Sequence, residues 1–282
     1  GDEQRILFTQ LCNVLEPRVA VALSSASNEL RTATQALLQQ LKADHEAAAA
    51  LCLKLGLRSC KELREAKEIR RKDKGLTAPD LALLGTLGSV LPALEMLRLD
   101  GCSGAAGPDG VQRLVEGLGA GVLPALTRLD LVRMDVGDAG ASALVAALGR
   151  GALPRLKVLA LVNAAIGDAG LVAFAPALRR RPALELLNLY GNPFGDEGLA
   201  ALVAPPPPAG APSPPKGGLT QLKRLDLDLT QITDAGCAAL VSALDSGMLP
   251  ALERVKLDQA PAASAAAKAD VHCALGLESY AF

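Results

Sequence analysis

The sequence predicts an α/β fold built from stacked strand–turn–helix units, preceded by an α-helical N-terminal region. Three observations lead to this prediction. Residues 123–152 read LPALTRLDLVRMDVGDAGASALVAALGRGA, and residues 153–181 and 219–248 repeat the pattern. Within each copy, the spacing of apolar residues changes from two, as in a strand, to the three-or-four spacing of a helix. Recurrence of such a unit at a regular period indicates a fold in which each repeat packs on its neighbours.

Residues 1–73 lack the repeat and are predicted to form a helical cap over the first repeat, because an open end of a stacked fold exposes its core. Leucines at helical spacing predict a helix over 28–55, and Ser59 with Glu62 predicts the start of another that runs to residue 72. The basic run 70–72 then interacts with the dipole of this helix at its C-terminus, or forms a basic binding patch. Thr77 and Asp80 are expected to cap the next helix.

One repeat illustrates the expected local structure. Leu129 and Leu131 lie two residues apart and therefore point to one face of a strand. A Gly-Asp-Ala-Gly turn follows at 137–140, where Asp138 is expected to cap the helix that it begins. A single repeat cannot bury its own leucines, so neighbouring repeats must cover them.

Six strands are predicted across residues 74–260. The first core leucines are spaced by 32, 30, 28, 38 and 30 residues, and occur at Leu94, Leu126, Leu156, Leu184, Leu222 and Leu252. The long spacing contains a Pro-rich insertion at 205–218, which we interpret as a surface loop; a docking site for a proline-binding domain is the alternative. Residues 261–282 are expected to form a C-terminal cap helix and an apolar tail with Tyr280 and Phe282.

This L-x-x-L-x-L strand-plus-helix unit resembles the ribonuclease-inhibitor-like class of leucine-rich repeats over roughly residues 74–259, and its Ala-rich copies resemble repeats of unicellular algae. The resemblance implies a curved solenoid with a parallel sheet on its concave side and helices outside, which binds other proteins. The chain departs from the class at the position after the strand that Asn or Cys usually holds. Its hydrogen-bond ladder should therefore be interrupted, since this position reads Cys102, Met134, Ala164, Asn192 and Thr230.

Composition argues against several classes of partner. A net charge of −1 gives little attraction toward nucleic acid or anionic lipid. No apolar run reaches the roughly 18 residues that a membrane-spanning helix needs, and residues 1–23 do not read as a secretory signal. The six cysteines are scattered and form no C-x-x-C pair, which predicts free thiols in a reducing compartment, in the cytoplasm or inside an organelle.

We find no catalytic constellation. The Gly-rich loop 101–110 lacks the Gly-Lys-Ser/Thr of a phosphate-binding loop, and one Asp per repeat at the same turn indicates helix caps rather than an acid–base pair. Neither of the two histidines lies in a metal-binding or nucleophile motif. We therefore expect no enzyme activity, no cofactor and no metal site.

The predicted function is a scaffold that binds a protein partner through the concave face, as part of a hetero-complex. The alternative is a regulator of an enzyme, such as a GTPase-activating protein or an inhibitor, because one branch of the resembled class has that role. Residues that alternate with the core leucines should point to the concave face. Charges such as Arg98 and Asp130, or Asp226 and Lys256, should pair at both ends. An apolar patch is expected between them, and the predicted partner-binding residues are Val158, Ala160, Val162, Leu186, Asn188, Tyr190, Arg128 and Arg224.

Overall fold

A computed structural model describes residues 21–22, 28–72, 75–101, 106, 109–181, 183–203 and 219–276. The Pro-rich insertion 205–218 lies outside the described residues, as do Cys102, Tyr280 and Phe282. The expectations made for these segments therefore stay predictions.

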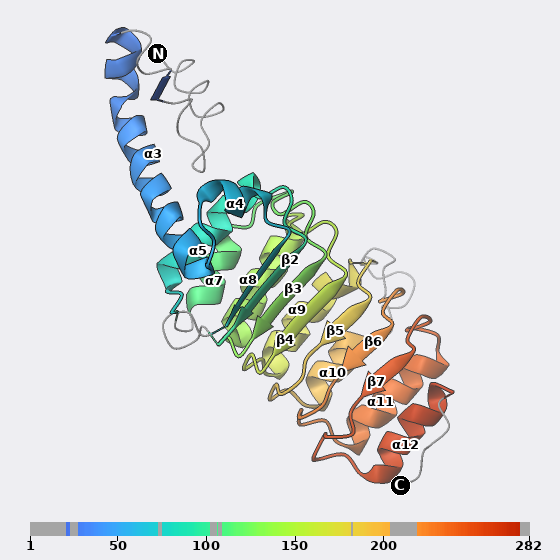
Figure 1. The fold of residues 1–282 in the computed structure, drawn as a ribbon. Helices are drawn as coiled ribbons and strands as arrows, with labels where there is room; N and C mark the ends of the chain where they lie inside the picture. The colour runs from blue at the N-terminus through green and yellow to red at the C-terminus, as the bar shows by residue number, and fades with distance from the viewer. Residues whose placement is uncertain are drawn as a thin grey trace.

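The described chain forms two layers, a parallel sheet and a row of helices on one of its faces (Figure 1). The sheet has seven strands in sequential order: β1 (Glu68–Lys72), β2 (Met96–Asp100), β3 (Arg128–Val132), β4 (Val158–Val162), β5 (Leu186–Asn188), β6 (Arg224–Asp226) and β7 (Arg254–Lys256). The helices are α3 (Asn28–Leu55), α4 (Cys60–Glu65), α5 (Ala78–Leu87), α7 (Asp109–Glu116), α8 (Gly137–Gly149), α9 (Asp168–Arg179), α10 (Asp196–Val203), α11 (Asp234–Asp245) and α12 (Ala265–Ala274), with the 3₁₀ turn η1 (Gly88–Val90) after α5.

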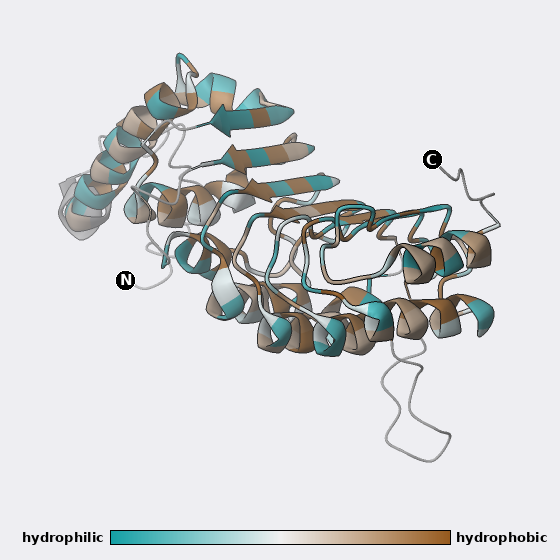
Figure 2. Cartoon of the chain, turned by 90° about the horizontal axis from the view of Figure 1, so that it is seen from below, coloured by the Kyte–Doolittle hydropathy of each residue, from teal (hydrophilic) through white to brown (hydrophobic). Residues whose placement is uncertain are grey.

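The two layers bend together, with the sheet on the inner side of the arc and the helices outside (Figure 2). Each strand is followed by a helix that returns the chain to the start of the next strand, so all neighbouring strands are parallel. This arrangement confirms the predicted α/β solenoid with an inner parallel sheet and outer helices.

The first strand corrects the sequence prediction, which placed six strands in the sheet and a helix up to residue 72. Helix α4 ends at Glu65, and β1 pairs with β2 in the register Glu68 to Met96. Charge pairs along a helix contribute only about 0.2–0.5 kcal/mol each. Burying Ile69 in the core and satisfying one edge of β2 outweighs them. The basic run 70–72 therefore lies on a sheet edge and not at a helix C-terminus.

The N-terminal helices attach to the first complete strand–helix unit. The last turns of α3 bury Leu51 and Leu55, and the Lys54 ammonium lies 2.6 Å from the Asp80 carboxylate at the start of α5. Thr77 and Asp80 form the predicted reciprocal cap. Burial alone would raise the pKa of Asp80, but hydrogen bonds from Lys54 and Thr77 outweigh it and hold the pKa below its ordinary value.

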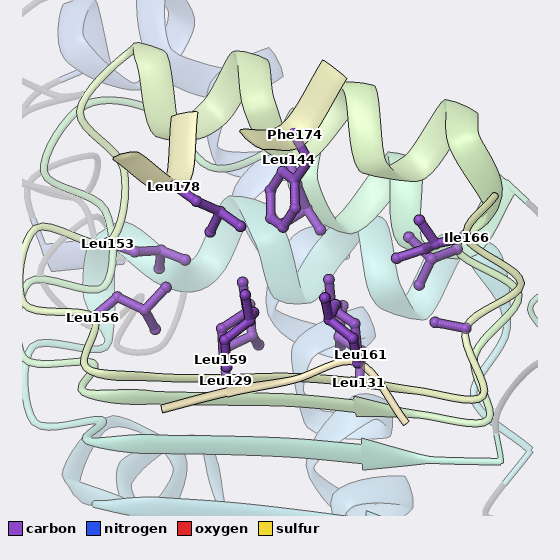
Figure 3. Packing of buried hydrophobic residues seen from close by; sticks show 14 of the residues in the cluster. Leu129, Leu131, Leu144, Leu153, Leu156, Leu159, Leu161, Ile166, Phe174 and Leu178 are labelled. Carbon is purple, nitrogen blue, oxygen red and sulfur yellow. The ribbon is translucent and has the colours of Figure 1, made fainter. Parts of the chain in front are cut away.

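The core lies between the two layers (Figure 3). Leu129 and Leu159 point from adjacent strands toward the helices, where they meet apolar side chains such as Phe174 of α9. All three are almost fully buried, which confirms the strand register that the sequence predicted. Each such burial removes enough apolar surface from water to contribute about 1.5–3 kcal/mol.

A left-handed residue recurs where the chain leaves the inner face. The positions have φ between 48° and 72°, and are Gly101, Arg133, Asn163, Gly191 and Leu229. In this conformation each backbone N–H donates to a carbonyl of the following repeat, as Leu229 does to Gln259. A residue with a side chain pays about 1–2 kcal/mol for such a φ. These backbone hydrogen bonds between neighbouring repeats therefore come at a conformational cost wherever the left-handed residue is not glycine.

Leu229→Gly is expected to stabilise the protein by about 0.5–1 kcal/mol, because glycine adopts this φ without a clash. Leu229 is 45% exposed, so removing its side chain sacrifices little packing. Urea denaturation measures the effect. Gly191→Ala is the control with opposite sign, since a Cβ there would collide with the Asn163 side chain. An unchanged or lower free energy of unfolding for Leu229→Gly contradicts the prediction.

Candidate functional site

The face of the sheet opposite the helices, here called the concave face, is formed by outward residues that align in columns across the strands. One column runs from Arg128 through Val158, Leu186 and Arg224 to Arg254. The next runs through Asp130, Ala160, Asn188, Asp226 and Lys256. Strand β1 extends both columns with Glu68 and Arg70, which the sequence analysis had placed on a helix.

The apolar centre of the concave face consists of Val158, Val162, Leu186 and Tyr190. All four are half-buried, so they present part of their side chains to solvent. Ala160 lies in the expected column but is only 5% exposed. Its methyl group therefore forms the floor between taller neighbours and offers little contact area of its own.

Leu229 is an exposed apolar residue that the sequence analysis did not select. Leu229 follows Asp228, whose carbonyl accepts a hydrogen bond from the N–H of Gly191, the residue after Tyr190. Leu229 therefore lies just past the end of β6, on the repeat after the one that carries Tyr190. It is 45% exposed. The available signal was a leucine at a position where the other repeats hold Gly, Arg or Asn.

Before the apolar centre, the charges of the concave face are paired. The Asp130 side chain is only 2% exposed, and the Arg128 Nε lies 2.9 Å from its carboxylate. Arg98 approaches the same carboxylate at 3.9 Å, which confirms the expected pair. Arg128, predicted to bind a partner, is thus already engaged by its own strand.

After the apolar centre, the pairing is less complete. Lys256 lies 3.6 Å from Asp226, as expected. Burial raises the pKa of Asp226, and the neighbouring Asp228 adds to this, although the Asp228 N–H and Lys256 act in the opposite direction. Arg224 and Arg254 are both exposed and lie directly opposite one another on β6 and β7. The sequence analysis selected Arg224 and missed Arg254.

The aspartates of the Gly-Asp turns bind the next repeat rather than their own helix, which corrects the expected role of Asp138. Its Oδ1 accepts a hydrogen bond of 2.9 Å from Gly167 N–H, at the start of α9. Asp168 likewise accepts bonds from Gly195 and Gly198 at the start of α10. These carboxylates satisfy free N–H groups of the following helix and lie in its favourable dipole field.

This geometry also explains the second glycine of the turn. A Cβ at Gly170 would collide with the Asp138 carboxylate, and one at Gly198 with that of Asp168. The Asp138 and Asp168 carboxylates therefore hold neighbouring repeats together.

Asn192 links two repeats at the edge where the strands end. Its side chain is buried and accepts hydrogen bonds from Ala164 and Ile166 N–H groups at 3.1 Å. Its amide donates to the carbonyls of Leu161 and Leu189 at 2.7 Å. At the equivalent position of the next repeat, the Thr230 hydroxyl donates one hydrogen bond to the Leu227 carbonyl. Met134 and Ala164 hold this position in earlier repeats and have apolar side chains.

A family model described as "Leucine Rich repeat" matches residues 123–145, 153–175, 183–203 and 218–241. These four segments of the chain are leucine-rich repeats. The four matches include strands β3 to β6 with all or most of the helix after each. No curated protein matches the chain. The apolar centre thus lies on the second and third of the matched leucine-rich repeats.

Outside the concave face, the described part of the chain offers few groups that could carry out chemistry. No group of His, Cys, Asp or Glu among the described residues could hold a metal ion, and no described helix could span a membrane. The Cys52 and Cys60 sulfurs lie 4.0 Å apart and are buried. Burial, with Cys60 beside it, raises the pKa of the Cys52 thiol to about 12, so it is not a ready nucleophile.

Proposed function

We propose that the protein is a non-catalytic scaffold that binds a protein partner through its concave face, as a subunit of a hetero-complex. Leucine-rich repeats generally mediate protein–protein interaction, and four of them form the middle of this sheet. The observation that carries the proposal is the apolar centre. Its side chains lie on the concave face, opposite the helices, so they do not pack into the core between the two layers.

The physical argument compares the two kinds of residue on the concave face. The ion pair Asp226–Lys256, whose lysine side chain is exposed to solvent, contributes about 0–1 kcal/mol to stability and keeps the face hydrated. Leu186 and Tyr190, in contrast, gain more by transfer from water into an interface. Tyrosine is enriched among residues that dominate binding energy, because its ring is apolar and its hydroxyl can donate a hydrogen bond. We expect the partner to seat on this centre.

The double variant Leu186→Asp, Tyr190→Asp is expected to weaken partner capture at least tenfold while the solenoid stays folded. Neither side chain points into the core, so circular dichroism and the unfolding midpoint should change little. Capture from native extract, with recovered proteins identified by mass spectrometry, measures the effect.

Val172→Asp is the matched control, because it places the same charge on a 38% exposed apolar residue of α9. It should leave capture unchanged. If the folded double variant recovers the same proteins in the same amounts as the unaltered chain, the partner binds elsewhere and the proposal is wrong.

A further inference from the structure

We infer that the partner segment that occupies the concave face is acidic, with a carboxylate two to four residues from an apolar anchor. The inference rests on the proposed function and adds the chemistry of the partner. Its basis is the pair Arg224 and Arg254, two exposed arginines that face each other across adjacent strands.

Their environment differs from that of the other cations on β2 to β7. Arg98, Arg128 and Lys256 each have a carboxylate within 4 Å. In the described residues, no ion pair joins Arg224 or Arg254 to an acidic group. Like charges directly opposite each other on neighbouring strands are destabilising. This pair therefore contributes nothing to the folded chain that would explain its position.

The groups around the pair leave it a net positive charge. Glu253 lines the same hollow, but among the described residues no ion pair joins it to either guanidinium. Asp226, on the same strand as Arg224, is paired with Lys256, and Lys223 is paired with Glu185. One acidic group from outside would thus meet two guanidinium groups with only one exposed carboxylate, Glu253, competing for them.

A carboxylate fits this position because its two oxygens accept parallel hydrogen bonds from a guanidinium. The required spacing follows from the column itself. Leu186 precedes Arg224 and Arg254 in the column, and neighbouring strands lie about 4.8 Å apart. The apolar anchor and the carboxylate must therefore be separated by roughly 5–10 Å. That distance corresponds to two or three residues in an extended segment and to three or four in a helix.

Selection of a random dodecapeptide display library on the full chain tests the inference. Peptides that bind should carry Asp or Glu two to four residues from Leu, Ile, Phe or Met. Their affinity should fall at least tenfold between about 50 and 300 mM salt, since exposed charge pairs are screened. Selection on the double variant Arg224→Glu, Arg254→Glu should instead enrich Lys or Arg at that spacing, and this variant should bind the original peptides at least tenfold more weakly.

The double variant Arg58→Glu, Lys61→Glu is the matched control, because it makes the same change in charge at exposed residues on and beside α4. It should select the same acidic peptides as the unaltered chain. Arg224→Gln with Arg254→Gln, which removes the charge without reversing it, should weaken binding of these peptides without enriching basic ones.

The remaining outcomes separate the inference from the function on which it rests. If peptides show no acidic preference, or none are enriched although the chain captures its partner, the carboxylate inference is wrong and the proposed function stands. If Leu186→Asp, Tyr190→Asp binds the selected peptides normally, the apolar centre is not part of their site and both proposals fail.

Discussion

Phe174→Ala is expected to lower the free energy of unfolding by about 3–5 kcal/mol. Phe174 has no exposed surface and lies among Leu144, Leu178 and the strand leucines, between the helix layer and the sheet (Figure 3). Its removal loses the transfer energy of the ring and leaves a cavity that the two rigid layers cannot close.

Urea denaturation at fixed temperature measures this loss. Val172→Ala is the matched control on the same helix, because Val172 is 38% exposed and its truncation should change stability by no more than about 0.5 kcal/mol. A loss below about 1 kcal/mol for Phe174→Ala would mean that the helix packs differently on the sheet.

Asn192→Ala is expected to cost about 3 kcal/mol or more, although it removes a small polar side chain. Two N–H groups, of Ala164 and Ile166, and two carbonyls, of Leu161 and Leu189, lose their partner. A buried polar group left without a hydrogen bond costs about 1–3 kcal/mol. Relaxation of the loop and entry of water reduce the sum but do not cancel it.

Thr230→Val provides the comparison, because Thr230 occupies the equivalent position and makes one hydrogen bond to Leu227. It should cost about 1 kcal/mol. Asn192→Asp should also destabilise, since a carboxylate faces two carbonyl oxygens to which the amide had donated. Equal unfolding free energies for Asn192→Ala and Thr230→Val would show that the Asn192 bonds add nothing.

The same hydrogen bonds show how the leucine-rich repeats are joined. Asn192 holds the strand end of one repeat to the next, and Asp138 and Asp168 do so at the helix starts. At the other end of the helices, the Arg181 guanidinium donates to the carbonyl of Leu148 in the last turn of α8, and to that of Ala152, just after the helix, at 2.9 Å. Burial lowers the pKa of Arg181, whose guanidinium donates hydrogen bonds to carbonyls that the end of the helix leaves free.

The repeat and its register were accessible from the sequence, because both depend on short-range periodicity. Side chains alternate strictly along a strand, so Leu129 and Leu131 could point only to the core once Asp130 pointed outward. The same rule placed Val158 and Leu186 on the concave face and predicted the pairs Arg98–Asp130 and Asp226–Lys256.

The tertiary structure was needed where contacts with a neighbouring repeat override or redirect the local signal. Residues 68–72 carry local helix signals, yet they form β1 because the edge of β2 offers backbone hydrogen bonds and a place for Ile69. Asp138 sits at a helix start, yet its carboxylate reaches Gly167 in the next repeat. Periodicity describes what one repeat contains. The hydrogen bonds that form between two stacked repeats depend on which donors and acceptors the folded chain brings within bonding distance.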